Sequence, residues 1–579
     1  MNLELQHGSR SRILAGLILV ITAIFVVRLF YLQVIKHDYY VKLSAAEQVK
    51  QFDLPAKRGL IYALDGSTPV PLALNEDVYT VFADPTAVKN TSAIIDTIQK
   101  VAGGNAEPNL DQRLGNTASR YQVLATRINR TQADLIKQKN FLGVGFTDLT
   151  QRVYPEGALA AQVLGFVDYS GTGQYGVEGG LNQQLKGKDG LEKTVTDVSD
   201  VPLTIGNQDI KIPAVDGTNE VLTIDRNVQA HAEQALATGL QKTGATNGSL
   251  IVMDPQTGKV MAMANLPSYD PATFNTVTDP AVFNNATVSA PYEPGSDIKT
   301  LTFATGIDKG VITADSTYNN TDYITVDNAT ISNATKGQTG NITIQHAFNW
   351  SLNTGFVTVA ERLGDGTNIN LQARNIMYDY FYNKFGLGQL TGIQLANEQA
   401  GIVVPPSDPQ GNAVRYSNMA FGQGLDATMV QVSAAFSSVI NGGHYYKPTI
   451  LAGTIDGSGA YIPLPTPTPI RTTISQSTSN QMLQALQTAR ATFYTRQDTP
   501  GYTIGGKTGT SQVVVNGVYS NTEAVGTYLG YGGTDTPRYV IMVQLSAPNK
   551  VFAGGTDAEP IFSDMSNWML NYLKLQPKG

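Results

Sequence analysis

A serine and a lysine, Ser296 and Lys299, stand three positions apart directly after a Pro-Gly break. The residues 300–307 that follow are mostly apolar and lead to Gly310, which predicts a buried helix that begins near Ser296. Positions i and i+3 share one face of a helix, so the hydroxyl and the amine are expected within hydrogen-bond distance. A lysine kept neutral by its surroundings can activate a serine nucleophile. Taken alone the pattern is weak, because an N-cap serine followed by a solvated lysine gives the same spacing.

Two further short motifs follow in the chain, Ser351-Leu352-Asn353 and Lys507-Thr508-Gly509-Thr510. The trio S-x-x-K, S-x-N and K-T-G is the signature of penicillin-binding proteins and class A β-lactamases. Each motif alone is common. All three in this order indicate an enzyme that forms a covalent intermediate on Ser296.

Composition narrows the class of protein. A length of 579 residues predicts two to four domains, and the net charge of −7 argues against a nucleic-acid partner. The chain has no cysteine, which excludes disulfides, thiol catalysis and Cys-ligated metals. Its five histidines show no zinc-binding spacing, so we expect no metal site.

An apolar segment near the N-terminus predicts a transmembrane anchor. Residues 13–27 carry no charge and apolar character continues to residue 35, about 23 residues in all, which is enough to cross a bilayer as a helix. Arg28 lies toward one end and can snorkel. A cleaved signal peptide is the alternative, but its small-residue site, Ser44-Ala45-Ala46, lies too far beyond the apolar core. Residues 1–12 are then a short tail before the anchor, and the flanking charges do not decide on which side of the membrane it lies.

Two regions follow the anchor. The pattern of residues 36–215 predicts an α+β domain with a strand at 78–83 and helices at 91–102 and 132–138. No motif in this region indicates a catalytic role. Residues 216–579 predict one large domain in which helices pack on a largely antiparallel sheet. Its expected strands are 220–225, 249–253, 260–264, 527–531 and 539–545, and its expected helices are 229–240, 344–350 and 477–490.

The chain resembles a class B penicillin-binding protein, the membrane-anchored transpeptidase of peptidoglycan synthesis, over nearly its whole length. The matching blocks are 58–62, 152–157, 175–179, 222–225, 385–388 and 421–424, besides the three motifs. Ala63, Asp297 and Thr300 depart from the family pattern, which commonly has an aspartate, a threonine and a proline there. Asp297 follows the serine directly and is expected to point aside. The resemblance implies a penicillin-binding transpeptidase or serine β-lactamase-like α+β fold at 216–579, after a pedestal or dimerisation-type domain at 36–215.

The resemblance also implies an acyl transfer. Ser296 would attack the carbonyl between the last two D-alanines of a stem peptide, and Lys299 would take the hydroxyl proton. A lysine base needs its pKa lowered from about 10.4 by burial or by a cationic neighbour, such as Lys507. Ser351 would relay the proton to the departing D-alanine, and Asn353 would hydrogen-bond the substrate amide and Lys299.

The K-T-G motif would hold the other end of the substrate. Lys507, Thr508 and Thr510 would bind the terminal carboxylate, and Gly509, without a side chain, would let the substrate backbone lie close. The backbone N–H groups of Ser296 and Thr510 would form an oxyanion hole. An amine from a second stem peptide would then resolve the acyl-enzyme into a cross-link, without a cofactor.

The implied ligands are D-Ala-D-Ala stem peptides and β-lactams, and the implied partners are the cytoplasmic membrane and a glycan-polymerising membrane protein, in cell division or in elongation. The substrate lies outside the membrane, so the N-terminus should be cytoplasmic and the catalytic domain extracytoplasmic.

Three different functions compete with this one. A bifunctional synthase is disfavoured, because 36–215 contains no E-D-x-x-F-type motif. A membrane-anchored serine β-lactamase or β-lactam sensor would share the serine chemistry, and a non-catalytic scaffold would have lost it. Glu361 and Glu398 are the only glutamates between Asn353 and Lys507, and neither has the E-x-x-L-N setting of a β-lactamase.

Overall fold

A computed structural model of the chain describes residues 5–40, 49–195, 210–515 and 517–578. Residues 1–4 of the expected tail and the small-residue site at Ser44-Ala45-Ala46 lie outside the described residues. The chain divides into two compact units, one made of Met1–Arg58 with Lys186–Gly217 and the other of Gly59–Leu185 with Thr218–Gly579. The expected domain boundaries at 36 and 216 stay predictions.

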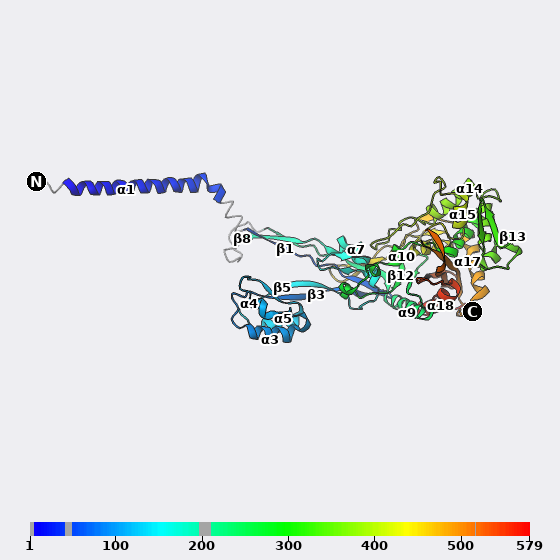
Figure 1. Cartoon of the computed structure of the whole chain (residues 1–579), viewed down its shortest axis with the longest axis horizontal. Helices are drawn as coiled ribbons and strands as arrows, with labels where there is room; N and C mark the ends of the chain where they lie inside the picture. Colours follow the sequence, from blue (N-terminus) through cyan, green and yellow to red (C-terminus); the bar gives the residue numbers. More distant parts are fainter. Residues whose placement is uncertain (1–4, 41–48, 196–209, 516, 579) are drawn as a thin grey trace. The chain divides into compact units, whose positions relative to one another are not determined.

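The first unit contains the apolar helix. Helix α1 (Leu5–Phe30) continues as a short π-helix, η1 (Tyr31–Ile35), and is drawn in blue in Figure 1. Within the described residues, Arg10–Ile35 is the one helical segment long and apolar enough to cross a membrane, and its apolar side chains are exposed. This confirms the expected N-terminal apolar helix, which is consistent with a membrane anchor.

A three-stranded antiparallel sheet completes the first unit. Strand β8 (Gly190–Val195) lies between β1 (Val49–Leu54) and β9 (Ile210–Ile212). The chain after β1 is held by side chains from the other segment of the unit, since Asp189 Oδ1 accepts from the Ala56 N–H at 2.8 Å and Asp216 Oδ1 from the Lys57 N–H at 2.9 Å.

The second unit begins with a seven-stranded sheet. Strands β2 (Ile61–Asp65) and β3 (Thr68–Ala83) form an antiparallel hairpin, and the strand order is β19-β18-β10-β2-β3-β4 with β5 also paired to β3. The other strands are β4 (Gln122–Asn129), β5 (Val144–Val153), β10 (Asn219–Asp225), β18 (Leu451–Ile455) and β19 (Tyr461–Pro463).

Three helices cover the β3–β4 part of this sheet: α3 (Thr91–Ala102), α4 (Leu110–Gly115) and α5 (Arg130–Lys137). Asn90 caps α3, and Asn129 and Gln132 form a capping box at the start of α5, so their positions follow from the sequence. The strand and helices expected between 78 and 138 are confirmed.

A five-stranded antiparallel sheet lies at the centre of the C-terminal part of the chain, with the order β12-β11-β23-β22-β21. Alternation divides its side chains between two cores: Leu250 and Val252 face one side, Ile251 and Met253 the other. The strands are β11 (Asn247–Met253), β12 (Val260–Leu266), β21 (Thr503–Val515), β22 (Val518–Gly533) and β23 (Pro537–Ser546). The expected antiparallel sheet is confirmed, and β21 is its edge strand.

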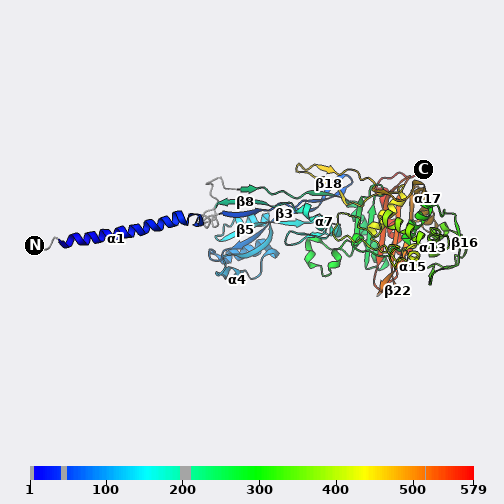
Figure 2. The ribbon, with the colours of Figure 1, turned by 90° about the horizontal axis from the view of Figure 1, so that it is seen from above.

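Helices cover both faces of this sheet. Helix α9 (Arg226–Thr243), which Asp225 caps, and α18 (Glu559–Tyr572) pack on one face. A helical lobe covers the other face, and three of its helices, α13, α15 and α17, are labelled in Figure 2. Its helices are α11 (Lys299–Asp308), α12 (Ile344–Asn349), α13 (Asn353–Arg362), α14 (Leu371–Tyr378), η6 (Asp379–Lys384), α15 (Ala413–Met419), α16 (Met429–Ile440) and α17 (Gln476–Phe493).

Short elements connect these layers. They are the helices η2 (Gly103–Asn105), α6 (Ala161–Leu164), α7 (Gly176–Gly180), α8 (Asn182–Lys186), η3 (Pro271–Thr276), η4 (Pro280–Phe283), α10 (Ala286–Ser289), η5 (Gly295–Ile298) and η7 (Gly554–Ala558), and the strands β6 (Phe166–Val167), β7 (Gly173–Gln174), β13 (Thr317–Asn320), β14 (Tyr323–Val326), β15 (Ala329–Ser332), β16 (Gly340–Thr343), β17 (His444–Tyr445) and β20 (Arg471–Thr472). Among them, Glu178 of α7 accepts from Arg152 Nε at 2.7 Å, a buried ion pair that joins two of the family-like blocks.

Candidate active site

Ser296 lies in η5, a single 3-10 turn that leads into α11. The helix expected near Ser296 therefore begins as a 3-10 turn and becomes α-helical at Lys299. Gly295, just before the serine, has a φ of +59°, and its N–H donates to the Gly422 carbonyl at 2.9 Å. A Cβ on Gly422 would overlap the Gly295 carbonyl, so two glycine backbones set the position of the serine.

Lys299 is fully buried and its amine is the centre of the site. Its Nζ lies 2.9 Å from Ser296 Oγ, 2.7 Å from the Ser351 carbonyl oxygen, 3.2 Å from Ser351 Oγ and 2.8 Å from Asn353 Oδ1. The first of these contacts is the i,i+3 pairing expected from the sequence, and the others bring the second motif to the first.

The second motif lies in a turn between two helices. Ser351 follows α12 and has a left-handed φ of 57°, which is uncommon for a residue other than glycine. Asn353 is the first residue of α13, and its Nδ2 donates to the Ser332 carbonyl at 2.9 Å. The break between the helices turns both side chains toward Lys299.

Lys507 reaches the site from the edge strand β21. Its Nζ donates to Ser351 Oγ at 2.9 Å and lies 3.0 Å from the carbonyl of Thr508, so Ser351 Oγ stands between the two lysines. Burial lowers the pKa of Lys299 well below its usual value, and the positive charge of Lys507 lowers it further. Burial also lowers the pKa of Lys507, and the carboxylate of Asp297 acts in the opposite direction. The site thus favours a neutral Lys299 next to a charged Lys507.

The K-T-G residues divide between the cleft and the interior. Thr508 and Thr510 line the cleft, and Thr510 Oγ1 accepts from the Gly554 N–H at 3.2 Å. Gly509 does not expose its open side to the cleft: a Cβ there would lie 2.8 Å from Asp297 Oδ2 and would overlap Thr527. Gly509 therefore makes room for these two buried side chains, and its expected closeness to the substrate backbone stays a prediction.

Ser296 lines a cleft of about 820 Å³. Ser351, Asn353, Lys507, Thr508 and Thr510 line it as well, while Lys299 is buried behind it. The remaining wall is polar and aromatic and includes Trp350, Phe421, Gln423, Phe493, Tyr494, Gln512, Tyr519 and Tyr528. Among the described residues that line the cleft, none is an aspartate or a glutamate.

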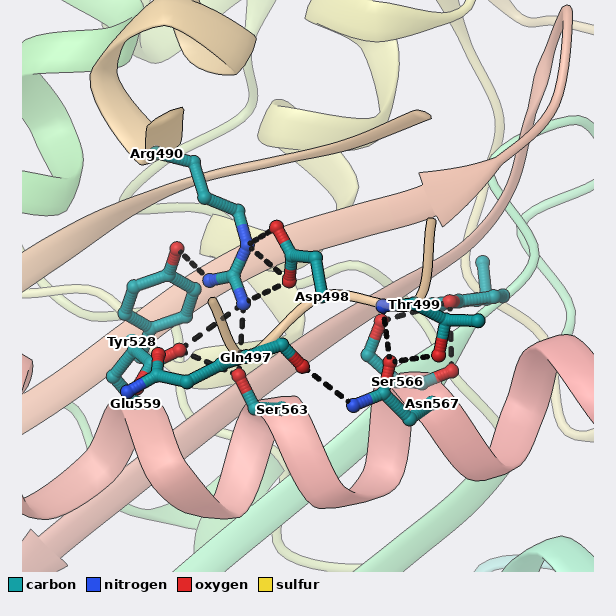
Figure 3. Close-up of polar contacts among 10 residues, drawn as sticks. Arg490, Gln497, Asp498, Thr499, Tyr528, Glu559, Ser563, Ser566 and Asn567 are labelled. Carbon is teal, nitrogen blue, oxygen red and sulfur yellow. Dashed lines mark hydrogen bonds and ion pairs between the residues drawn. The ribbon is translucent and has the colours of Figure 1, made fainter. Parts of the chain in front are cut away.

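Arg490 is a part of the cleft that the motifs did not indicate. It is 1% exposed at the end of α17 and joins three elements, as Figure 3 shows. Its guanidinium contacts Asp498 at 2.6 Å, Glu559 of α18 at 3.1 Å and Tyr528 of β22 at 2.5 Å. One signal was available: Met482, Ala485, Leu486 and Ala489 give α17 an apolar face, and Arg490 falls on it.

Two family models match this chain. The model described as the penicillin binding protein transpeptidase domain matches residues 248–567, and the one described as the penicillin-binding protein dimerisation domain matches residues 53–222. The chain belongs to the penicillin-binding proteins. The chain is 31% identical to "Penicillin-binding protein PbpB" of Mycobacterium tuberculosis, and the match covers 97% of this chain and 84% of that relative. "Peptidoglycan D,D-transpeptidase FtsI" of Escherichia coli is 26% identical, covering 98% and 92%.

A solved structure of a penicillin-binding protein supports the same assignment. Penicillin binding protein 3 of Mycobacterium tuberculosis, complexed with aztreonam, matches with a TM-score of 0.67 and 26% identity, covering 91% of this chain and 98% of that one. The predicted family, the α+β fold and the activity of a serine-type peptidoglycan D,D-transpeptidase that binds β-lactams are confirmed. The predicted roles of individual residues stay predictions.

Proposed function

We propose that this penicillin-binding protein cross-links stem peptides through an acyl-enzyme on Ser296, with Lys299 as the base. The observation that carries the proposal is the position of Lys299 Nζ. A neutral amine has two N–H bonds and one lone pair. The Ser351 carbonyl at 2.7 Å and Asn353 Oδ1 at 2.8 Å engage both N–H bonds, which leaves the lone pair free to accept the proton of Ser296 Oγ at 2.9 Å.

The acylation half-reaction then follows the hydrogen bonds. Ser296 Oγ attacks the carbonyl carbon between the two terminal D-alanines while its proton passes to Lys299. The proton continues through Ser351 Oγ, which lies 3.2 Å from Lys299 Nζ, to the nitrogen of the departing D-alanine. Backbone N–H groups of Ser296 and Thr510 hold the oxyanion, at about 3–4 kcal/mol per donor in other enzymes.

Lys507 and the neighbouring K-T-G residues orient the substrate. Lys507, Thr508 and Thr510 bind the carboxylate of the terminal D-alanine, or that of a β-lactam, and Asn353 hydrogen-bonds the substrate amide. Expulsion of D-alanine empties this side of the cleft. A stem-peptide amine then attacks the ester, gives its proton back through Ser351 and Lys299, and releases Ser296 with a new cross-link.

The location of this reaction follows from its substrate. We assign residues 13–35 to a membrane anchor, with the N-terminus in the cytoplasm and residues 36–579 outside, where peptidoglycan lies. The pedestal at 36–215 is non-catalytic, so glycan strands have to come from a polymerising membrane partner. Among the described residues, the cleft contains no carboxylate to activate water, which argues against a β-lactamase.

Labelling with a fluorescent penicillin tests the assignment of the nucleophile. Ser296→Ala should abolish covalent labelling of the full-length protein while leaving its melting temperature close to that of the wild type. Ser289→Ala is a matched control, because Ser289 lies seven positions upstream and its hydroxyl donates to the Asn285 carbonyl, away from the three motifs. Stoichiometric labelling of the Ser296→Ala protein would refute the proposal.

A further inference from the structure

Asp297, the residue after the nucleophile, departs from the family pattern and is buried under the K-T-G strand. It is 1% exposed, and its Oδ2 accepts a hydrogen bond from Thr527 Oγ1 at 2.7 Å. Thr527 lies on β22 directly opposite Gly509 of β21. The side chain does point away from the cleft, as expected, but it contacts the strand that supplies the second catalytic lysine.

The Asp297 carboxylate occupies the space left by the missing side chain of Gly509, close to Lys507. A Cβ on Gly509 would lie 2.8 Å from Asp297 Oδ2, so the carboxylate occupies the space that a side chain at position 509 would fill. Positions 507 and 509 point to the same face of the strand, about 6.5–7 Å apart. The buried Asp297 carboxylate therefore lies beside the buried Lys507 side chain.

The titratable groups near Asp297 and Lys507 come from β21, from α11 and from the segment before η5. Lys507 faces it from β21, and Tyr292, a buried phenol, faces it from the segment before η5. Lys299 of α11 faces Lys507, and Ser351 Oγ joins the two amines at 3.2 and 2.9 Å. Burial raises the pKa of Asp297 to about 7, while the hydrogen bond from Thr527 and the charge of Lys507 lower it, so Asp297 is ionised where Lys507, with a pKa of about 8, loses its proton. The electrostatic environments of the two buried amines thus differ, because the Asp297 carboxylate lies nearer to Lys507 than to Lys299.

We propose that Asp297 is a positioning residue that decides where the proton of this two-lysine site resides: its carboxylate keeps Lys507 charged and thereby leaves Lys299 neutral. The inference rests on the proposed reaction at Ser296. A charged Lys507 binds the substrate carboxylate and disfavours a second ammonium on Lys299. Without Asp297, the shared proton is no longer biased toward Lys507, and both lysines lose their roles together.

The pH profile of acylation tests this proposal on the full-length protein in detergent. The second-order rate of labelling by fluorescent penicillin should rise as Lys299 loses its proton and fall as Lys507 loses its own. In Asp297→Asn and Asp297→Thr the falling limb should move to lower pH by about one unit, with a loss of up to about tenfold at a fixed pH on that limb. Asparagine keeps the shape of the side chain, and threonine is the residue that the family commonly has there.

Glu361→Gln is the matched control. Glu361 is also a carboxyl whose pKa burial raises, but it lies at the opposite end of α13 from Asn353. Its removal should leave both limbs in place.

Unmoved limbs in the Asp297 variants, or a uniform loss of rate across the profile, would overturn the proposal in favour of a packing role. So would loss of folding in both variants, judged by melting. Failure of the wild type to label would instead overturn the proposed function.

Discussion

Replacing Arg490 by methionine should destabilise the catalytic region through one buried carboxylate. In the wild type the guanidinium compensates Glu559, which is fully buried, and Asp498, which is partly exposed. Removing one partner of a buried ion pair typically costs about 3–5 kcal/mol of unfolding free energy, because it leaves an uncompensated charge. Asp498 can turn to solvent, so we attribute most of this loss to Glu559.

This reasoning predicts rescue by a second substitution. Arg490→Met/Glu559→Gln removes the orphaned charge and should recover at least about half of the 3–5 kcal/mol lost in Arg490→Met. It also predicts a pH dependence. Burial already raises the pKa of Glu559 above 4.5 in the folded protein, and without Arg490 it rises further. Above 4.5 the folded state then binds more protons than the unfolded state, so the stability of Arg490→Met falls as pH rises.

Urea denaturation of the wild type and the three variants, at about pH 5.5 and about pH 7.5, measures both effects. The deficit of Arg490→Met should be larger at the higher pH, and Glu559→Gln alone should show little pH dependence. A double variant no more stable than Arg490→Met, or a deficit equal at both pH values, would refute the assignment of the cost to Glu559. Since Tyr528 and Tyr494 line the cleft beside Arg490, the same variant should also label more slowly with penicillin.

Three further predictions concern the reaction and its setting. The penicilloyl adduct on Ser296 should persist for many minutes to hours, because the described residues of the cleft include no carboxylate that could activate water for deacylation. A deacylation rate about six decades below that of a fast hydrolase corresponds to a barrier about 8 kcal/mol higher. Intact-mass spectrometry after removal of free penicillin checks this, and loss within seconds would favour a β-lactamase. External protease on intact protoplasts should destroy the large domain, whereas full protection would contradict the outward topology. The purified protein should not polymerise lipid-linked disaccharide, and long glycan strands made without an added polymerase would reveal a missed domain.

The sequence was most informative where chemistry depends on local spacing. The contact of Ser296 with Lys299 follows from helical periodicity alone, and it lies at 2.9 Å. The hairpin of β11 and β12 and the helices α3 and α17 likewise follow from turns, caps and apolar periodicity. These features need no knowledge of distant parts of the chain.

Contacts set by strand register could not be predicted in this way. Asp297 meets Thr527 across 230 positions, and only the pairing of β21 with β22 places Gly509 opposite that threonine. A one-residue slip would turn these side chains to the other face. The space that Gly509 leaves for Asp297 and Thr527 could not be predicted for the same reason. Arg490 was missed because its partners come from β22 and α18.

The two glycines behind the nucleophile limit how such an enzyme can evolve under antibiotic selection. Gly295 and Gly422 meet backbone to backbone, and any side chain at Gly422 would collide with the carbonyl before Ser296. The wall behind the serine is therefore formed by main-chain atoms. A point mutation can shift these atoms but cannot change their chemical identity. Substitutions that lower drug affinity and leave this backbone contact intact are therefore expected at side chains that line the cleft, such as Gln423, Phe493 and Gln512.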